Sequence, residues 1–119
     1  MAKRKKRLKI GLALGGGSAK GFAHIGVLKV LHKNKIYPDY IAGTSAGAMV
    51  GALYAAGHSP EQIEEMAQKT DWKKVLDFTI PKQGLLAGKL MENKIRKELG
   101  GKTFSQLNIP FQAVAYNLD

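Results

Sequence analysis

The segment 43-GTSAG-47 places Ser45 between two glycines, after a short apolar stretch and before a run of small residues. The pattern G-x-S-x-G at the junction of a strand and a helix is typical of a nucleophilic serine held on a sharp turn. Side chains two positions to either side of the serine would collide in such a turn. This steric requirement explains why Gly43 and Gly47 carry no side chain, and it makes Ser45 a candidate nucleophile.

Thr44 and Ala46 flank the serine, and the small residues from Ala46 to Ala56 predict a helix that stops at Gly57. The N–H groups and the positive dipole end of this helix would point at the serine oxygen and favour negative charge there. A helix built from such small residues also lets a neighbouring backbone approach closely.

A second loop whose residues could take part in catalysis is 15-GGGSAKG-21. Its three consecutive glycines, Gly15, Gly16 and Gly17, leave backbone N–H groups that no side chain shields. Such groups can hydrogen-bond the oxyanion of a tetrahedral intermediate. Lys20 would add positive charge to the loop. The serine turn and this loop together predict a site for acyl transfer.

The elements before the two loops predict that they meet. Leu8–Leu14 is a short apolar strand, Lys20–His32 has apolar residues at helical spacing, and Tyr40–Gly43 is a second strand. A strand–helix–strand crossover leaves its two strands parallel, so their carboxyl ends share one edge of the sheet. We therefore expect the glycine loop to lie beside Ser45.

The remaining chain adds two helices and one strand. Ser59, Pro60 and Gln62 predict a capped helix start, because a serine cap, an early proline and a glutamine at the third position agree. The expected elements are a helix over 59–69, a helix from Gly88 to Leu99 and a strand over 111–116. The order is that of an α/β domain with a parallel sheet. Since no helix follows the last strand, residues 10–119 are interpreted as the N-terminal portion of a larger domain.

The charge of the chain is uneven. The net charge is +10, and residues 1–9 carry six of the basic side chains. The first nine residues are interpreted as a flexible basic leader, with peripheral contact of residues 3–9 with an anionic membrane as an alternative. No surface for nucleic acid is predicted. The absence of cysteine fits a reducing compartment, so we expect a cytoplasmic protein, in part at the inner membrane surface. No pattern predicts a metal, a cofactor or an oligomeric state.

The glycine loop has a competing interpretation as a phosphate-binding loop. Gly15, Gly17 and Gly21 give G-x-G-x-x-x-G, which departs from the dinucleotide-binding pattern, and no G-K-[ST] follows as in a P-loop. Asp39, the acid nearest the expected distance, precedes the second strand rather than following it. A non-catalytic lipid- or anion-binding module nevertheless stays open as the alternative function.

The proton acceptor for Ser45 is harder to assign. His58 would lie about 20 Å away along the helix that follows the serine, at 1.5 Å per residue. His24 would lie near the loop, but it precedes the serine in the chain, and we interpret it mainly as a packing residue. Asp71 and Asp77 are expected in a helical stretch around Trp72, and each is more simply interpreted as a surface or capping acid than as the catalytic base. The base is therefore a carboxylate or is absent.

The segments 14-LGGGSAKGFAHIGVLKVL-31 and 41-IAGTSAGAMVGALYAAG-57 together resemble the patatin-like phospholipase family, and residues 84–119 are similar to the middle of its bacterial members. The resemblance implies a three-layer α/β fold related to the α/β hydrolases, with a Ser–Asp dyad that needs no histidine or cofactor. It also implies action on acyl esters of lipids, as in a phospholipase A. The nucleophile of the family corresponds to Ser45. Its oxyanion loop and a nearby basic residue correspond to Gly15, Gly16, Gly17, Ser18 and Lys20.

One part of the family pattern is missing. The catalytic aspartate of the family lies in a D-G-[GA] motif, which this sequence lacks. Asn117 stands where relatives usually have Asp, and Asp119 is at a position that is not catalytic. We therefore expect the aspartate of the dyad to lie beyond this chain, and these 119 residues alone to be weakly active or inactive.

Overall fold

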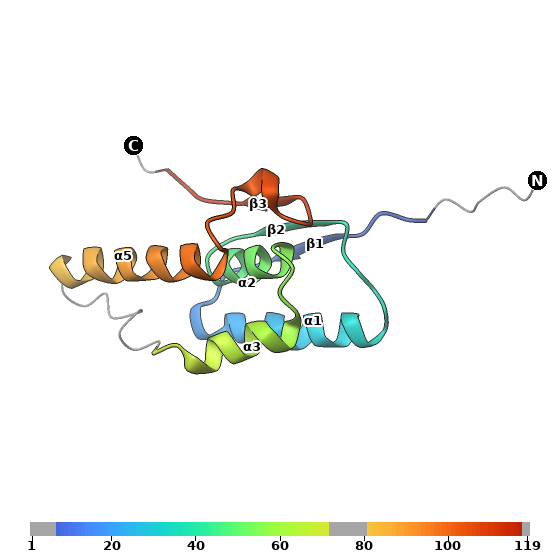
Figure 1. The fold of residues 1–119 in the computed structure, drawn as a ribbon, viewed down its shortest axis with the longest axis horizontal. Helices are drawn as coiled ribbons and strands as arrows, with labels where there is room; N and C mark the ends of the chain where they lie inside the picture. Colours follow the sequence, from blue (N-terminus) through green and yellow to red (C-terminus); the bar gives the residue numbers. More distant parts are fainter. Residues whose placement is uncertain (1–6, 72–80, 118–119) are drawn as a thin grey trace, which may run out of the picture.

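The computed structural model describes residues 7–71 and 81–117. Figure 1 shows the path of the chain through them. The elements, in chain order, are β1 (Gly11–Leu14), the short 3-10 helix η1 (Ser18–Phe22), α1 (Ala23–Lys33), β2 (Tyr40–Gly43), α2 (Ala46–Ala55), α3 (Pro60–Lys69), α5 (Pro81–Glu98), the 3-10 turn η2 (Phe104–Gln106) and β3 (Phe111–Ala113).

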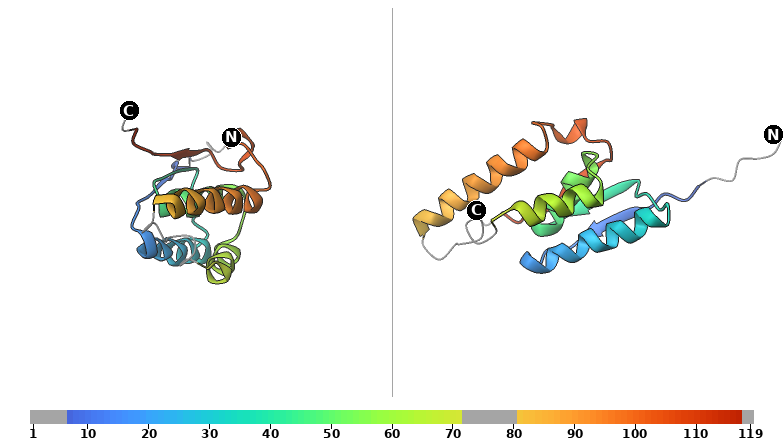
Figure 2. Two further views of the ribbon diagram at one scale, coloured as in Figure 1. Left: turned by 90° about the vertical axis from the view of Figure 1, so that its left-hand side faces the viewer. Right: turned by 60° about the horizontal axis from the view of Figure 1, so that its bottom comes forward.

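The three strands form one parallel sheet in the order β1-β2-β3. Leu14 lies opposite Gly43, and Gly43 lies opposite Ala113, so the carboxyl ends of all three strands share one edge. The predicted α/β fold with a parallel sheet is confirmed. The α-helices lie on one side of the sheet, where α2 contacts every strand while α1 and α3 pack outside it (Figures 1 and 2). The described residues thus form the sheet and one helical side of it.

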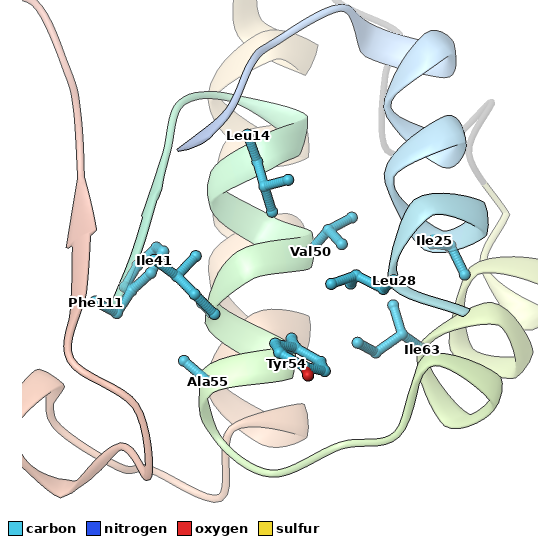
Figure 3. Close-up of a cluster of buried hydrophobic side chains, with 10 residues drawn as sticks. Leu14, Ile25, Leu28, Ile41, Val50, Tyr54, Ala55, Ile63 and Phe111 are labelled. Carbon is cyan, nitrogen blue, oxygen red and sulfur yellow. The ribbon is translucent and has the colours of Figure 1, made fainter. Parts of the chain in front are cut away.

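Helix α2 packs closely on the sheet because of its small residues. A Cβ atom on Gly51 would lie 3.0 Å from Ile41 Cγ2 and 3.1 Å from Phe111 Cε2, so a side chain there would push the side chains of both strands away from α2. Figure 3 shows Leu14, Ile41 and Phe111 on the sheet side of α2, and the α1 and α3 side chains on its other side. The predicted close approach is confirmed.

The predicted helix start at Ser59 is also confirmed. Ser59 Oγ accepts a hydrogen bond from the Gln62 N–H at 3.1 Å, and Gln62 Oε1 accepts one from the Ser59 N–H at 2.8 Å. Pro60 stands at the first helical position, where its missing N–H costs nothing. This capping box fixes the direction of α3 as it leaves the end of α2.

Helix α5 corrects one prediction. It begins at Pro81, seven residues before the predicted start at Gly88. The segment 84-GLLAG-88 contains two glycines, each of which weakens a helix by about 1 kcal/mol relative to alanine. The helix continues through both, and proline in the first helical turn is the sequence signal that the prediction overlooked.

Smaller corrections concern the ends of three other elements. β1 starts at Gly11 rather than Leu8, whose side chain is 84% exposed, and β3 ends at Ala113 rather than Tyr116, which is 87% exposed. The predicted helix over 20–32 consists of η1 followed by α1. Asp71 lies just past α3 in irregular structure. Trp72 and Asp77 fall outside the described residues, as do residues 1–6 of the leader.

The described end of the basic leader is attached to the sheet. Arg7 Nη2 lies 2.5 Å from Asp39 Oδ1, and Asp39 Oδ2 accepts a hydrogen bond from the Ile10 N–H at 2.8 Å. These two contacts hold the pKa of the Asp39 carboxyl below its ordinary value of 3.8, the backbone N–H having the larger effect. Within the described helices, none combines the length and hydropathy needed to cross a bilayer.

Candidate active site

The glycine loop lies against Ser45, as the strand order predicted. A Cβ atom on Gly16 would be 3.2 Å from Ser45 Cβ and 3.8 Å from Ser45 Oγ. The backbone after β1 and the side chain after β2 therefore touch at the carboxyl edge of the sheet, although 29 positions separate them in the sequence. Ser45 is exposed, so its hydroxyl is open to a substrate.

The turn that carries Ser45 has a strained backbone. Ser45 adopts φ 52° and ψ −125°, in the positive-φ range that side chains disfavour, a conformation that costs on the order of 1–3 kcal/mol. A Cβ atom on Gly43 would lie 2.5 Å from Gly47 O, and one on Gly47 would lie 2.2 Å from Leu14 O. Both distances are far below van der Waals contact, so glycine is required at each position for this turn to form.

Thr44 fixes the turn to the strands on either side of β2. Its N–H donates to Leu14 O at 3.1 Å, and its Oγ1 donates to Val114 O at 3.0 Å. The Val114 N–H in turn donates to Gly43 O at 2.9 Å. Helix α2 begins directly after the serine, where the Gly47 N–H donates to Thr44 O at 2.9 Å and the Ala48 N–H donates to Ser45 O at 2.9 Å. The serine thus sits between three strands and one helix N-terminus.

The glycine loop turns sharply and rests on the start of α2. Gly17 has φ 141° and Ser18 has φ 49°, and the Lys20 N–H closes the turn onto Gly17 O at 2.9 Å. A Cβ atom on Gly21 would be 2.4 Å from Ala46 Cβ, so η1 contacts the first residue of α2. Lys20 is exposed within η1 and adds positive charge at this edge.

His24 is hydrogen-bonded to the backbone of the glycine loop. Its Nε2 lies 2.7 Å from Gly15 O, and since a carbonyl oxygen only accepts, Nε2 must carry the proton that forms this bond. The packing interpretation of His24 is consistent with this contact, although its partner could not be predicted from the sequence. The contact links the first turn of α1 to the loop that lies against Ser45.

The other two histidines are engaged far from Ser45. His32 Nε2 pairs with the Tyr54 hydroxyl, and His58 Nε2 donates to Glu98 O at 2.8 Å. Over the residues that the structure describes, no hydrogen bond joins Ser45 to an imidazole or a carboxylate. The same residues contain no group of three or more metal-ligating side chains. Among the described residues, the groups gathered at this edge of the sheet are the Ser45 hydroxyl and the backbone of the glycine loop.

An apolar cavity of about 420 Å³ opens beside Ser45 and was not predicted from the sequence. Its size is within the range of roughly 300–1,000 Å³ that small-molecule sites occupy. It runs between α2, α3 and α5, and residues of η1 also contribute to its wall. The signal in the sequence was the recurrence of methionines and other apolar residues at helical spacing on three helices, which equally suits a closed core. A larger, shallower hollow of about 850 Å³ lies over the other face of the sheet and does not include Ser45.

Comparison with known proteins identifies the family. The family model described as patatin-like phospholipase matches residues 12–118, which is nearly the whole chain. The chain belongs to the patatin-like phospholipase family. The earlier resemblance is thereby confirmed.

Relatives of this family differ greatly in length from the chain. Patatin-like phospholipase domain-containing protein 6 of Mus musculus is 36% identical over an alignment of 110 residues that covers 86% of this chain and 8% of that protein. An uncharacterized NTE family protein of Mycobacterium tuberculosis is 37% identical over 113 residues, covering 92% of this chain and 31% of that protein. The chain therefore spans less than a third of either relative.

One solved structure supports the fold of the patatin-like chain. The crystal structure of the type III effector protein ExoU superimposes with a TM-score of 0.55 at 24% sequence identity. The match covers 76% of this chain and 23% of ExoU. The described elements therefore have the arrangement of part of a larger α/β domain.

Proposed function

We propose that this patatin-like protein is a serine esterase that cleaves acyl esters of lipids, with Ser45 as its nucleophile. The observation that carries the proposal is the contact between Gly16 and the Ser45 side chain. It sets unshielded backbone N–H groups beside an exposed hydroxyl on a strained turn. Membership of the patatin-like phospholipase family supports the substrate class.

The proposed reaction has two halves. Ser45 Oγ attacks the ester carbonyl carbon while its proton passes to a base, and the resulting oxyanion accepts hydrogen bonds from N–H groups of residues 15–18. The bond from the carbonyl carbon to the alcohol oxygen then breaks, and the alcohol leaves with the proton. Water then gives a proton to the same base and attacks the acyl carbon, the bond from that carbon to Ser45 Oγ breaks, and the proton passes from the base to Ser45 Oγ as the carboxylic acid leaves. Each oxyanion donor of this kind is worth about 3–4 kcal/mol in the transition state.

The base in this proposal is an aspartate outside the described residues, forming a Ser–Asp dyad. It follows from the family pattern and from the fact that, across residues 7–71 and 81–117, no carboxylate or imidazole is hydrogen-bonded to Ser45. Lys20 and the N-terminus of α2 would favour negative charge near the serine. Thr44, through its bonds to β1 and β3, would keep the serine in place during both halves of the reaction.

The basic leader is proposed to bring the esterase to its substrate. Residues 3–9 would contact anionic headgroups at the inner surface of a membrane, each basic side chain contributing about 1 kcal/mol near such a surface. Arg7 is already paired with Asp39, so it would contribute less than its neighbours. Binding to vesicles with and without phosphatidylserine tests this point, and equal binding to both would contradict it.

A fluorophosphonate probe tests the nucleophile directly. We expect Ser45 of the full-length protein to be labelled and Ser45→Ala to abolish the labelling. Ser105→Ala is the matched control, because Ser105 lies in η2 and its hydroxyl is paired with Thr103 Oγ1 at 3.1 Å. Labelling that survives Ser45→Ala would contradict the proposed role of the serine.

A non-catalytic lipid- or anion-binding module is the second candidate, favoured because, in the described part of the chain, no carboxylate or imidazole is hydrogen-bonded to Ser45. The two candidates differ in turnover. Residues 1–119 expressed alone should hydrolyse p-nitrophenyl butyrate weakly or not at all, whereas the full-length protein should do so in a manner that depends on Ser45. Robust Ser45-dependent turnover by the 119 residues alone would show that the base lies within them.

A further inference from the structure

The apolar cavity beside Ser45 is a groove between three helices. Each helix contributes residues at helical spacing, so one face of each points inward. The apolar side chains that form the walls are Met49 and Leu53 from α2, Met66 and Ala67 from α3, and Met91 and Ile95 from α5. The two charged residues of the lining, Lys94 and Glu98, both come from α5 and are only partly buried.

The groove has a direction that is set by α2. Ser45 immediately precedes α2 and Leu53 lies eight residues further along, so the groove extends about 12 Å from the serine at 1.5 Å per residue. At the far end, α5 is tied to the turn after α2, because His58 Nε2 donates to Glu98 O at 2.8 Å. The buried side chain of Ile63 on α3 contributes to the same end. The serine is therefore near one end and packed side chains are at the other.

The side chains that line the groove determine which part of the substrate it can bind. Beside the methionine, leucine and isoleucine side chains, which offer no hydrogen bonds, a glycerol or phosphate group would lose its hydration without compensation, and the charged residues of the lining are confined to α5. An alkyl chain loses nothing of this kind and gains from leaving water. After the first half of the proposed reaction, the acyl group is the part of the substrate that stays bonded to Ser45 Oγ. A groove that begins at Ser45 is thus placed to receive that group.

We propose that the groove between α2, α3 and α5 holds the acyl chain of the ester, and that it accommodates about ten carbons. This inference rests on the proposed function. The length follows because three bonds of an extended chain span about 3.3–3.6 Å, so about ten bonds fill the groove. The flexible side chains of Met49, Met66 and Met91 can adjust to acyl chains of different shapes, so we expect the groove to accept several acyl chains rather than one. Carbons beyond the tenth extend past Leu53 or into solvent and gain nothing.

A chain-length series on the full-length protein tests the inference. We expect kcat/KM for p-nitrophenyl esters to rise about fourfold per methylene from butyrate to decanoate, the value of one buried methylene, and to level off for palmitate. Ala67→Phe fills the groove from α3 and should reduce kcat/KM for decanoate at least about tenfold more than for butyrate. Gln68→Phe is the matched control, since Gln68 is the exposed neighbour on the same helix and should leave the profile unchanged.

A binding measurement separates this inference from the proposed reaction. Decanoate should bind the Ser45→Ala protein more tightly than butyrate, and Ala67→Phe in that background should abolish the difference. Met49→Phe, which fills the groove from α2, gives the same test if Ala67→Phe does not fold. Binding of this kind without ester turnover would uphold the groove and refute the reaction. Ester turnover with a chain-length profile that neither filling variant alters would refute the groove and leave the proposed reaction standing. The absence of both chain-length-dependent binding and ester turnover would refute the groove and the reaction together.

Discussion

The two ends of the parallel sheet are stabilised in different ways. At the carboxyl end, backbones meet without intervening side chains: Gly47 lies so close to Leu14 O that a Cβ atom would be 2.2 Å from it, and Gly16 lies against Ser45. At the amino end, the leader is attached by the Arg7–Asp39 ion pair and by the Ile10 N–H. The carboxyl end is thus held by steric fit and the amino end by charge. The candidate active site lies at the carboxyl end, where the backbones are in contact.

The difference predicts unequal tolerance to substitution. Two backbone segments in contact cannot move apart without changing the whole turn, because protein interiors are close-packed. An ion pair whose arginine side chain is 66% exposed can be replaced by water at little cost. Substitutions at the carboxyl end should therefore have large effects, and those at the amino end small ones.

Gly47→Ala should give the largest effect. Its Cβ would lie 2.2 Å from Leu14 O and 2.6 Å from Gly15 O, both backbone atoms, so β1 and α2 would have to separate. We expect the free energy of unfolding in urea to fall by about 3 kcal/mol, at the upper end for an overpacked site.

Gly26→Ala is the control for that substitution. Gly26 lies within α1 and a Cβ atom there has nothing within 4 Å, so the same chemical change should stabilise the protein by about 0.5–1 kcal/mol. Equal effects of the two substitutions would show that the close approach at Gly47 is not needed.

Gly16→Ala should act on catalysis more than on stability. The new methyl group would be 3.2 Å from Ser45 Cβ, so the loop must move by a few tenths of an ångström relative to the serine. We expect kcat for p-nitrophenyl butyrate to fall by about tenfold with little change in KM, because donor placement matters most in the transition state. A rise in KM at constant kcat would argue that the loop binds substrate and does not stabilise the oxyanion.

His24→Leu should reduce kcat to a smaller extent. It removes the donor to Gly15 O, and a neutral hydrogen bond of this kind is worth about 1 kcal/mol, or roughly fivefold in rate. His24→Gln can place an N–H near the same oxygen and should restore part of the rate. If the glutamine variant is no better than leucine while both unfold at the same urea concentration, the carbonyl contact does not position the loop.

Asp39→Asn should have the smallest effect and should change only the acid side of the stability profile. The pKa of Asp39 is lowered in the folded protein, so the unfolded state binds the proton more readily, and Asp39 contributes stability above its ordinary pKa of 3.8 that is lost as the pH falls below it. The variant should therefore lose less stability on acidification than the wild type, with unchanged activity near neutral pH. An activity loss comparable to that of Gly16→Ala would contradict the contrast between the two ends.

The sequence predicted most of the architecture because its signals are local. Tyr40–Gly43 and the Ser59–Gln62 capping box lie where they were expected, and the crossover topology was sufficient to bring Gly16 to Ser45. The predicted start at Gly88 was wrong, because α5 begins at Pro81 and continues through Gly88.

Features that depend on contacts between distant elements were not predictable. The bond from His24 to Gly15 O depends on how η1 turns, and the groove beside Ser45 depends on where α5 lies relative to α2 and α3. Methionines at helical spacing indicate burial, but only the packing of three helices decides whether they enclose a core or line a cavity.

The most direct measurement is a crystal structure of the full-length protein after reaction with a fluorophosphonate. The phosphonyl group on Ser45 Oγ mimics the tetrahedral intermediate, so the account predicts its free oxygen at about 2.7–3.1 Å from backbone nitrogens of the glycine loop, with Gly16 or Gly17 among them. An adduct on Ser45 whose oxygen points into solvent, with no N–H of residues 15–18 in hydrogen-bonding range, would contradict the account.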